Sequence, residues 1–337
     1  MVSVKDIAAS CHVSVATVSK ALNGYSDVSE QKRKLIKEKA RELGYFPNSA
    51  AIALKTNRSY NIGILFVDAA NNGFTNEYFA KVLQAVKEKS EAQGYDITFI
   101  NNRIGGRVVT YTEHCKYRGV DGVVLACIDF DEPEVIELVN SGIPVVTIDH
   151  VFNNAMSVVS DNVKGVHDLL KYVYDMGHRN VAFIHGADSS VSRDRLTSFY
   201  RSVDELGLVV PEEYVMECDY RDSKKACECT KKLLDLKNPP TCILYPDDFT
   251  SIGGINEIKR RNLRIPEDIS VVGYDGISYA KAMEPPLTTL EQDCTRIGCA
   301  AAENLIRLIE KPKTTLVDKQ VVEGKVLIGK SVNRLKS

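Results

Sequence analysis

From residue 61 onward, short apolar runs alternate with amphipathic stretches, and this alternation limits the folds open to the chain. The runs are rich in Val and Ile, as expected of strands that are covered on both faces. They lie at residues 61–67, 95–101, 120–127, 143–149, 180–186, 240–246 and 268–275. The amphipathic stretches have helical spacing and lie at residues 79–94, 163–177, 197–207, 225–237 and 295–310. The pattern predicts an α/β fold with parallel sheets.

The length of this region indicates more than one lobe. About 275 of the 337 residues belong to it, which is generous for a single open sheet. We therefore expect a domain at 61–337 built from two lobes with a cleft between them. The expected first lobe covers about 61–160 plus 290–318, and the expected second lobe covers about 163–288 plus 320–337.

Residues 1–46 follow a different pattern, that of three short helices. The first is expected at residues 4–11. The second lies between Ser14, a good N-cap, and the stop signal Asn23-Gly24. The third is expected at residues 29–43. This order predicts an all-α helix-turn-helix head.

The head and the remainder of the chain carry opposite charge. Residues 1–58 hold ten Lys and Arg against five Asp and Glu, whereas the remainder holds 33 against 40. A basic head on an acidic body indicates that only the head meets a polyanion.

The second helix has an unusually small outer face. A helix that enters a major groove about 12 Å wide must be slim, and Val15 and Ala16 are small enough to approach thymine methyl groups. Lys20 can donate to guanine O6 and N7, as a point charge. The residues expected to contact the DNA backbone are Ser14, Thr17, Ser19 and Asn23. An amphipathic helix with a solvated lysine is the alternative.

Residues 47–60 are expected to form a hinge and linker. Pro47 disfavours a helix at the residue before it, and Asn48 can cap a short helix of about eight residues. A helix that short is marginal alone in water, so we expect it to form only where another surface supports it.

Polar residues follow several of the predicted strands. Asp149, Asp247 and Asp275 stand at or just after strand ends, where ligands of open parallel sheets bind. Arg195 and Tyr220 lie nearby in sequence order. Carboxylates, an arginine and an aromatic ring in a cleft suit a sugar or another small metabolite. An Asp at a strand end can instead cap the next helix, and that alternative stays open.

The whole series of parts resembles the LacI/GalR family of bacterial transcriptional repressors. The segments that carry the resemblance are "VKDIAASCHVSVATVSKALNG", "ELGYFPNSAAIALK", "GHRNVAFIHG", "ISVVGYD" and "PPLTTLEQD". The resemblance implies a periplasmic-binding-protein-like body and a homodimer on palindromic operator DNA. It also implies a small-molecule effector, a carbohydrate or alternatively a nucleobase, and agrees with base readers at residues 15, 16 and 20.

The resemblance assigns further residues. In the hinge, Leu54 matches a leucine that wedges into the minor groove, flanked by Asn48 and Lys55. Ile52 departs from the family pattern, which often has Arg there.

In the body, Tyr78 and Phe79 match an aromatic segment at the mouth of the pocket. Asp247 stands where sugar-binding members often have Asn, and Gly276 where another Asp is frequent. The added charge at Asp247 favours polyol or amine donors, while Arg195 leaves an anionic ligand open.

Several functional classes find no support in the sequence. No apolar run reaches the roughly 18 residues of a membrane span, and the N-terminus has no secretory pattern, so a cytoplasmic protein is expected. Nine scattered cysteines without CxxC spacing predict neither a disulfide framework nor a metal site. Cys227 and Cys229 can touch a metal or respond to an oxidant, but ordinary helix residues are favoured. No cofactor motif or catalytic nucleophile is present.

Two alternatives to a repressor remain. A solute-binding protein fits the body but not the basic head or the missing export signal. An enzyme would use cleft carboxylates such as Asp149 and Asp247 for acid–base chemistry.

Overall fold

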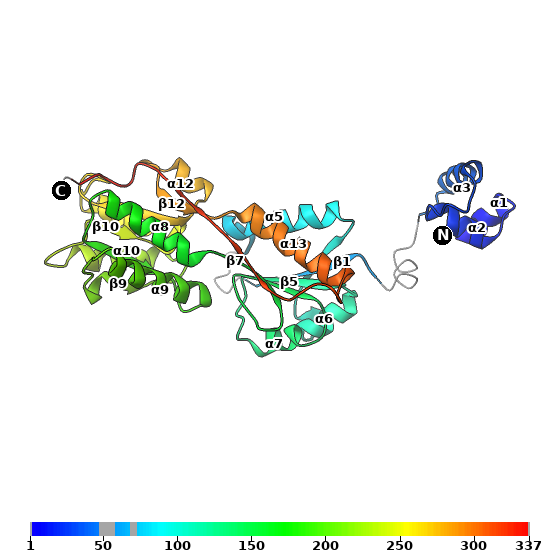
Figure 1. Cartoon of the computed structure of the whole chain (residues 1–337), viewed down its shortest axis with the longest axis horizontal. Coiled ribbons are helices and arrows are strands. Elements are labelled where there is room, and N and C mark those ends of the chain that lie inside the picture. Colours follow the sequence, from blue (N-terminus) through cyan, green and yellow to red (C-terminus); the bar gives the residue numbers. More distant parts are fainter. Residues whose placement is uncertain (1, 47–57, 68–72, 336–337) are drawn as a thin grey trace. The chain divides into compact units, whose positions relative to one another are not determined.

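The computed structural model describes residues 2–46, 58–67 and 73–335. The chain divides into two compact units, residues 1–59 and residues 60–337 (Figure 1). The first contains the three-helix head and the second the two-lobed α/β body. The hinge helix expected around Asn48, Leu54 and Lys55 lies outside the described residues.

The head consists of α1 (Val4–Ser10), α2 (Val15–Leu22) and α3 (Glu30–Glu42). Its core contains Ile7, Val18 and Ile36, one from each helix and all fully buried. Ser14 caps α2 as predicted, since its hydroxyl accepts a hydrogen bond from the Thr17 N–H at 3.1 Å. His12, in the turn before α2, has a φ of 53°, a left-handed conformation that His tolerates better than most residues.

The first lobe of the body contains a six-stranded sheet in the order β13-β7-β6-β5-β1-β2, in which every neighbouring pair is parallel. Its strands are β1 (Asn61–Phe66), β2 (Asp96–Ile100), β5 (Gly122–Ala126), β6 (Val145–Ile148), β7 (Met156–Ser160) and β13 (Lys319–Val322). Helices α5 (Glu77–Ala92) and α13 (Cys294–Glu310) share one core with the sheet. Helices α6 (Tyr111–Arg118) and α7 (Pro133–Val139) share the other. A short turn η1 (Gly73–Thr75) and a hairpin of β3 (Arg103–Ile104) and β4 (Arg107–Val108) complete this lobe.

The second lobe repeats this plan with the order β14-β12-β11-β10-β8-β9, parallel except for the β12–β14 pair. Its strands are β8 (Val181–His185), β9 (Val215–Glu217), β10 (Cys242–Leu244), β11 (Ser270–Asp275), β12 (Thr288–Glu291) and β14 (Lys325–Leu327). One core contains α8 (Asn162–Asp175) and α9 (Ser190–Glu205). The other contains α10 (Ser223–Leu234), α11 (Asp248–Arg260) and α12 (Ser278–Ala282), and η2 (Glu212–Tyr214) precedes β9.

The chain crosses between the lobes three times, after β7, after β12 and after β13 (Figure 1). The lobe boundaries therefore differ slightly from those expected. Residues 290–291 pair within the second sheet, and residues 319–322 pair within the first. The strand at Lys319–Val322 lies at a sheet edge and is mostly exposed, so it has no long apolar run to mark it in the sequence.

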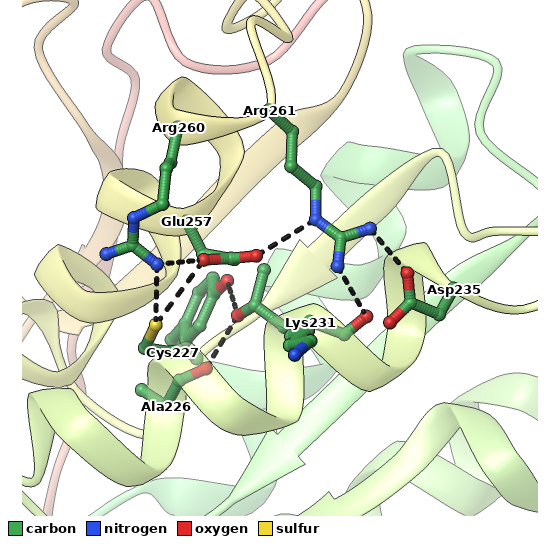
Figure 2. A network of polar contacts seen from close by, with 9 residues as sticks. Ala226, Cys227, Lys231, Asp235, Glu257, Arg260 and Arg261 are labelled. Atoms are coloured by element: carbon green, nitrogen blue, oxygen red, sulfur yellow. Dashed lines mark hydrogen bonds and ion pairs between the residues drawn. The ribbon is translucent and has the colours of Figure 1, made fainter.

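A polar network joins α10 to α11 in the second lobe (Figure 2). The nearly buried carboxylate of Glu257 accepts hydrogen bonds from Arg260 and, at 2.9 Å, from Arg261 Nε. Arg261 also donates to Asp235 at 2.7 Å, at the end of α10. Cys227 of α10 lies beside the same carboxylate, with its sulfur 3.6 Å from Oε2. The loops that precede α10 and α11 border the cavity described below. The packing of the two helices therefore holds these loops in position relative to one another.

Glu257→Gln is expected to lower the free energy of unfolding by about 1–3 kcal/mol at neutral pH, because two arginines lose an ionised partner. The hydrogen bond from Arg261 is the main reason that the pKa of Glu257 lies below its ordinary value. Its contribution is therefore present above the pKa of the unfolded chain and is lost as pH falls through the lower folded pKa. Urea unfolding should show that the free energies of unfolding of the wild type and of Glu257→Gln become equal in strong acid. Glu91→Gln, in the exposed pair with Lys87, is the control and should cost far less. Equal losses in both variants would contradict the prediction.

Candidate functional site

One cavity of about 1010 Å³ lies between the lobes of the body. All seven residues predicted for the ligand pocket line it, and they come from both lobes. They are Tyr78, Phe79, Asp149, Arg195, Tyr220, Asp247 and Asp275. The three carboxylates lie together because the carboxyl ends of the two sheets face the same cavity.

Asp149 directly follows β6 and has a φ of 60°. Its Oδ2 accepts a hydrogen bond from the Tyr78 hydroxyl at 2.6 Å, and its Oδ1 accepts one from the Ser160 N–H at 3.1 Å. Burial raises the pKa of this carboxyl above its ordinary value, and the two hydrogen bonds oppose the shift. Asp149 is therefore held in a defined orientation but at an electrostatic cost.

Asp275 ends β11 with a φ of 107°. Its Oδ1 accepts from Gln292 Nε2 at 2.7 Å, and Gln292 Oε1 in turn accepts from the Ser160 hydroxyl. Burial raises the pKa of Asp275 to about 7, although Arg195 opposes that shift. Because the Ser160 N–H also donates to Asp149, Ser160 and Gln292 link the two carboxylates through hydrogen bonds. Ser160 and Gln292 each lie where the chain crosses between the lobes.

Asp247 lies between β10 and α11 and has a structural role as well. It caps α11, accepting from the Thr250 N–H and hydroxyl, each at 2.6 Å. It also accepts from the Arg221 N–H at 2.9 Å. The capping alternative thus holds for Asp247, which lines the cavity with both oxygens already hydrogen-bonded.

Arg195 projects from α9 and is 5% exposed. Its Nε donates to Asn162 Oδ1 and its Nη1 donates to the Pro246 carbonyl, both at 2.8 Å. The guanidinium lies 3.5 Å from the centre of the Tyr274 ring. These contacts fix the guanidinium before any ligand arrives, and its positive charge favours the ionised forms of Asp149 and Asp275.

Some lining residues were not predicted from the sequence. Gln292 was not predicted as a lining residue, although it lies in the segment "PPLTTLEQD" that carries the family resemblance, because its contact with Asp275 depends on a chain crossing. Phe130 and His150 also line the cavity, and their rings stack 4.3 Å apart at 8°. Burial lowers the pKa of His150, so its imidazole is neutral at physiological pH. His178, by contrast, is buried away from the cavity, between Thr241 and the Asn333 carbonyl.

In the head, the predicted outer face of α2 is at the surface. Val15, Ala16 and Lys20 are exposed, whereas Val18 and Ala21 on the opposite face are buried. The Lys20 ammonium forms an ion pair with Asp27, which a base contact would have to replace.

The residues expected to contact the DNA backbone take part in local hydrogen bonds. Ser14 and Thr17 share one at 2.8 Å, and the Asn23 side chain donates to the Ser19 carbonyl at 2.6 Å. The expected hinge contacts Leu54, Asn48 and Lys55 lie outside the described residues.

Other classes of site were searched for in the same residues. Within 2–46, 58–67 and 73–335, no cluster of His, Cys, Asp and Glu side chains could hold a metal ion. Within those ranges no helix is both long and apolar enough to cross a membrane. All nine cysteines are free thiols. Cys227 and Cys229 lie on α10, the former half-buried beside Glu257 and the latter in the core.

Fold and cavity together define a two-lobed binding body joined to a helix-turn-helix head, and comparison with known proteins agrees. Residues 3–48 match the family model described as bacterial regulatory proteins, lacI family, and residues 170–332 match the periplasmic binding protein-like domain. The HTH-type transcriptional repressor PurR of Pasteurella multocida (strain Pm70) is 30% identical, over 92% of this chain and 93% of that protein. The probable HTH-type transcriptional repressor ExuR of Bacillus subtilis (strain 168) is 29% identical, over 99% of each.

Two solved structures have the same fold. The lac repressor dimer bound to operator and the anti-inducer ONPF superimposes with a TM-score of 0.81 at 23% identity, over 98% of this chain and 99% of that one. The CelR–cellobiose complex gives 0.71 at 24% identity, over 98% and 100%. The chain belongs to the lacI family of bacterial transcriptional regulators.

Asp275→Asn is expected to change how stability depends on pH. The folded pKa of about 7 lies above the ordinary Asp value of 3.8, so the folded protein binds the proton more tightly and loses stability as pH rises from about 4 to about 7. The variant lacks this loss and should gain on the order of a few kcal/mol relative to the wild type across that window. Unfolding at a series of pH values measures it. Asp129→Asn, an exposed carboxylate of the same cavity, is the control. A difference that does not grow with pH would contradict the prediction.

Proposed function

We propose that this protein is a sequence-specific transcriptional repressor whose affinity for operator DNA is controlled by a small molecule bound between the lobes. The observation that carries the proposal is one cavity lined from both lobes by three carboxylates, a buried arginine and aromatic rings, in a chain that begins with a helix-turn-helix head. The domain division at 1–46, 47–60 and 61–337 is part of this proposal.

The head would place α2 in the major groove. Val15 and Ala16 would pack on base edges and Lys20 would donate to guanine, after leaving Asp27. Ser14, Thr17, Ser19 and Asn23 would contact phosphates and fix the register without reading sequence. Two heads in a homodimer would read a palindromic site, and Leu54 between Asn48 and Lys55 would enter the minor groove at its centre.

The effector would be a neutral polyhydroxylated molecule, most simply a carbohydrate, with a nucleobase as the alternative. Asp149 and Asp275 can accept hydrogen bonds from hydroxyl groups, and the stacked Phe130–His150 pair offers a flat surface for an apolar sugar face. Among structures of this fold, one is a cellobiose complex and another contains bound ribose. The relatives are named as repressors, which supports binding rather than turnover, and the site of action would be the cytoplasm, where the DNA is.

Lys20→Ala is expected to lower affinity for the specific operator by about 1–3 kcal/mol and affinity for random duplex by much less. The operator is obtained by selecting duplexes from a random library with the wild-type protein, and gel shifts at several salt concentrations measure both affinities. Lys37→Ala on α3 removes another exposed charge of the head and should reduce both affinities alike. An equal loss on both DNAs for Lys20→Ala would exclude it as a base reader.

A panel of neutral sugars and free nucleobases is expected to contain a compound that raises the melting temperature of the full chain, because binding to the folded state alone stabilises it. Tyr220→Phe should leave the response largely intact, whereas Asp275→Asn should weaken binding of the active compound by about tenfold, the loss of one charged acceptor. The active compound is then added to the operator complex, and the affinity for the operator is expected to change. If no compound in either class shifts the melting temperature, the proposed effector class is wrong.

A further inference from the structure

Glu77 of the first lobe and Ser278 of the second lobe meet at the rim of the cavity. Glu77 is the first residue of α5, and Ser278 is the first residue of α12. The Ser278 N–H donates to Glu77 Oε1 and the Ser278 hydroxyl donates to Oε2, both at 2.7 Å. Both oxygens of one carboxylate thus bind a single residue of the opposite lobe, so the pair can form at only one separation of the lobes.

Helix α12 has no cap of its own. Its N-cap position is Ile277, whose side chain cannot accept a hydrogen bond. The first N–H groups of a helix need acceptors from outside it. For Ser278 that acceptor comes from the first lobe, so the start of α12 is completed only when the lobes are together.

The two partners are each held within their own lobe. The Ile277 N–H donates to the buried Asp248 at 3.0 Å, which fixes the backbone just before Ser278. On the other side, Lys81 forms an ion pair with Glu77 at 2.6 Å, one turn along α5. The contact therefore joins two pre-positioned groups, which reduces the entropy lost when it forms.

Besides the Ser160–Gln292 contact at the chain crossing, two other hydrogen bonds join the lobes near the cavity. Arg221 Nη1 donates to the Thr75 carbonyl at 3.3 Å, and the Ser190 hydroxyl donates to the Asp149 carbonyl at 3.0 Å. Thr75 lies two residues before Glu77, so one short segment of the first lobe contacts two separate loops of the second.

We propose that Glu77 and Ser278 form a clasp that holds the two lobes closed and so determines how tightly the cavity retains its ligand. They act as positioning residues, because the Glu77 carboxylate is occupied by Ser278 and Lys81. Only the consequence for ligand retention rests on the proposed function. Closure itself is a property of the body and can be measured without DNA or effector.

Ser278→Pro tests the clasp, because it removes the N–H and the hydroxyl together. Proline is tolerated at the first position of a helix, and Ile277 has the extended ψ of 159° that a following proline requires. Hydrogen–deuterium exchange of the full chain is measured for segments 188–192 and 219–222, which carry the other cross-lobe contacts. We expect amides there to exchange about fivefold faster in the variant, the effect of one ordinary hydrogen bond.

Two matched variants serve as controls. Ser278→Thr keeps both donors and should exchange like the wild type. Lys87→Ala removes an exposed charge of the same helix, paired with Glu91 and not with Glu77, and should leave segments 188–192 and 219–222 unchanged. Unchanged exchange in the central strands of both sheets excludes general unfolding as the cause.

Faster exchange confined to residues 277–282 would overturn the proposal, because the contact would then be only a helix cap. No change in any segment would overturn it as well. Because the measurement needs neither DNA nor ligand, its failure leaves the proposed function standing, and a missing operator or effector leaves the clasp standing.

Discussion

The cavity depends on the burial of several carboxylates beside a single deeply buried guanidinium. Asp149, Asp247 and Asp275 come from different strand ends. Burial makes Asp149 and Asp275 costly to ionise, and the charges of Asp247 and Asp149 raise that cost further for Asp275. Arg195 and the donors Tyr78 and Gln292 offset only part of that cost. A site left short of donors favours a ligand that brings its own, which is why hydroxyl-rich or protonated ligands suit it better than anions.

The same groups connect the lobes. Asp149 belongs to the first lobe and Asp275 to the second, and the Ser160–Gln292 hydrogen bond joins them where the chain crosses. A ligand that binds both carboxylates therefore acts on the boundary that the lobes must hold when they close. Its differential affinity for the closed form sets how far it shifts the lobe equilibrium, as in any two-state system.

The sequence predicted Asp149, Asp247 and Asp275 because they obey a local rule, that ligand groups of open parallel sheets stand at strand ends. Tyr78 and Phe79 were predicted only from the family resemblance. The sequence could not predict Gln292 or the Glu77–Ser278 contact, which depend on how two lobes pack and leave no local pattern. Strands β7 and β12 were missed because Ser and Thr interrupt their apolar runs. In the head the exposed face of α2 was predicted correctly, since helical periodicity alone separates its buried and exposed positions.

Ligand binding and lobe closure share one short piece of backbone. Asp275 faces the cavity and Ser278 meets the opposite lobe, only three residues later. Between them Gly276 has a φ of 69°, and a side chain there would collide with Glu291 at 2.6 Å. Because the Ile277 N–H also donates to Asp248, residues 275–278 have little freedom to move independently of one another. If the proposed effector binds Asp275, it also restricts Ser278 three residues later, and the proposed clasp would then be coupled to ligand binding through this short segment alone.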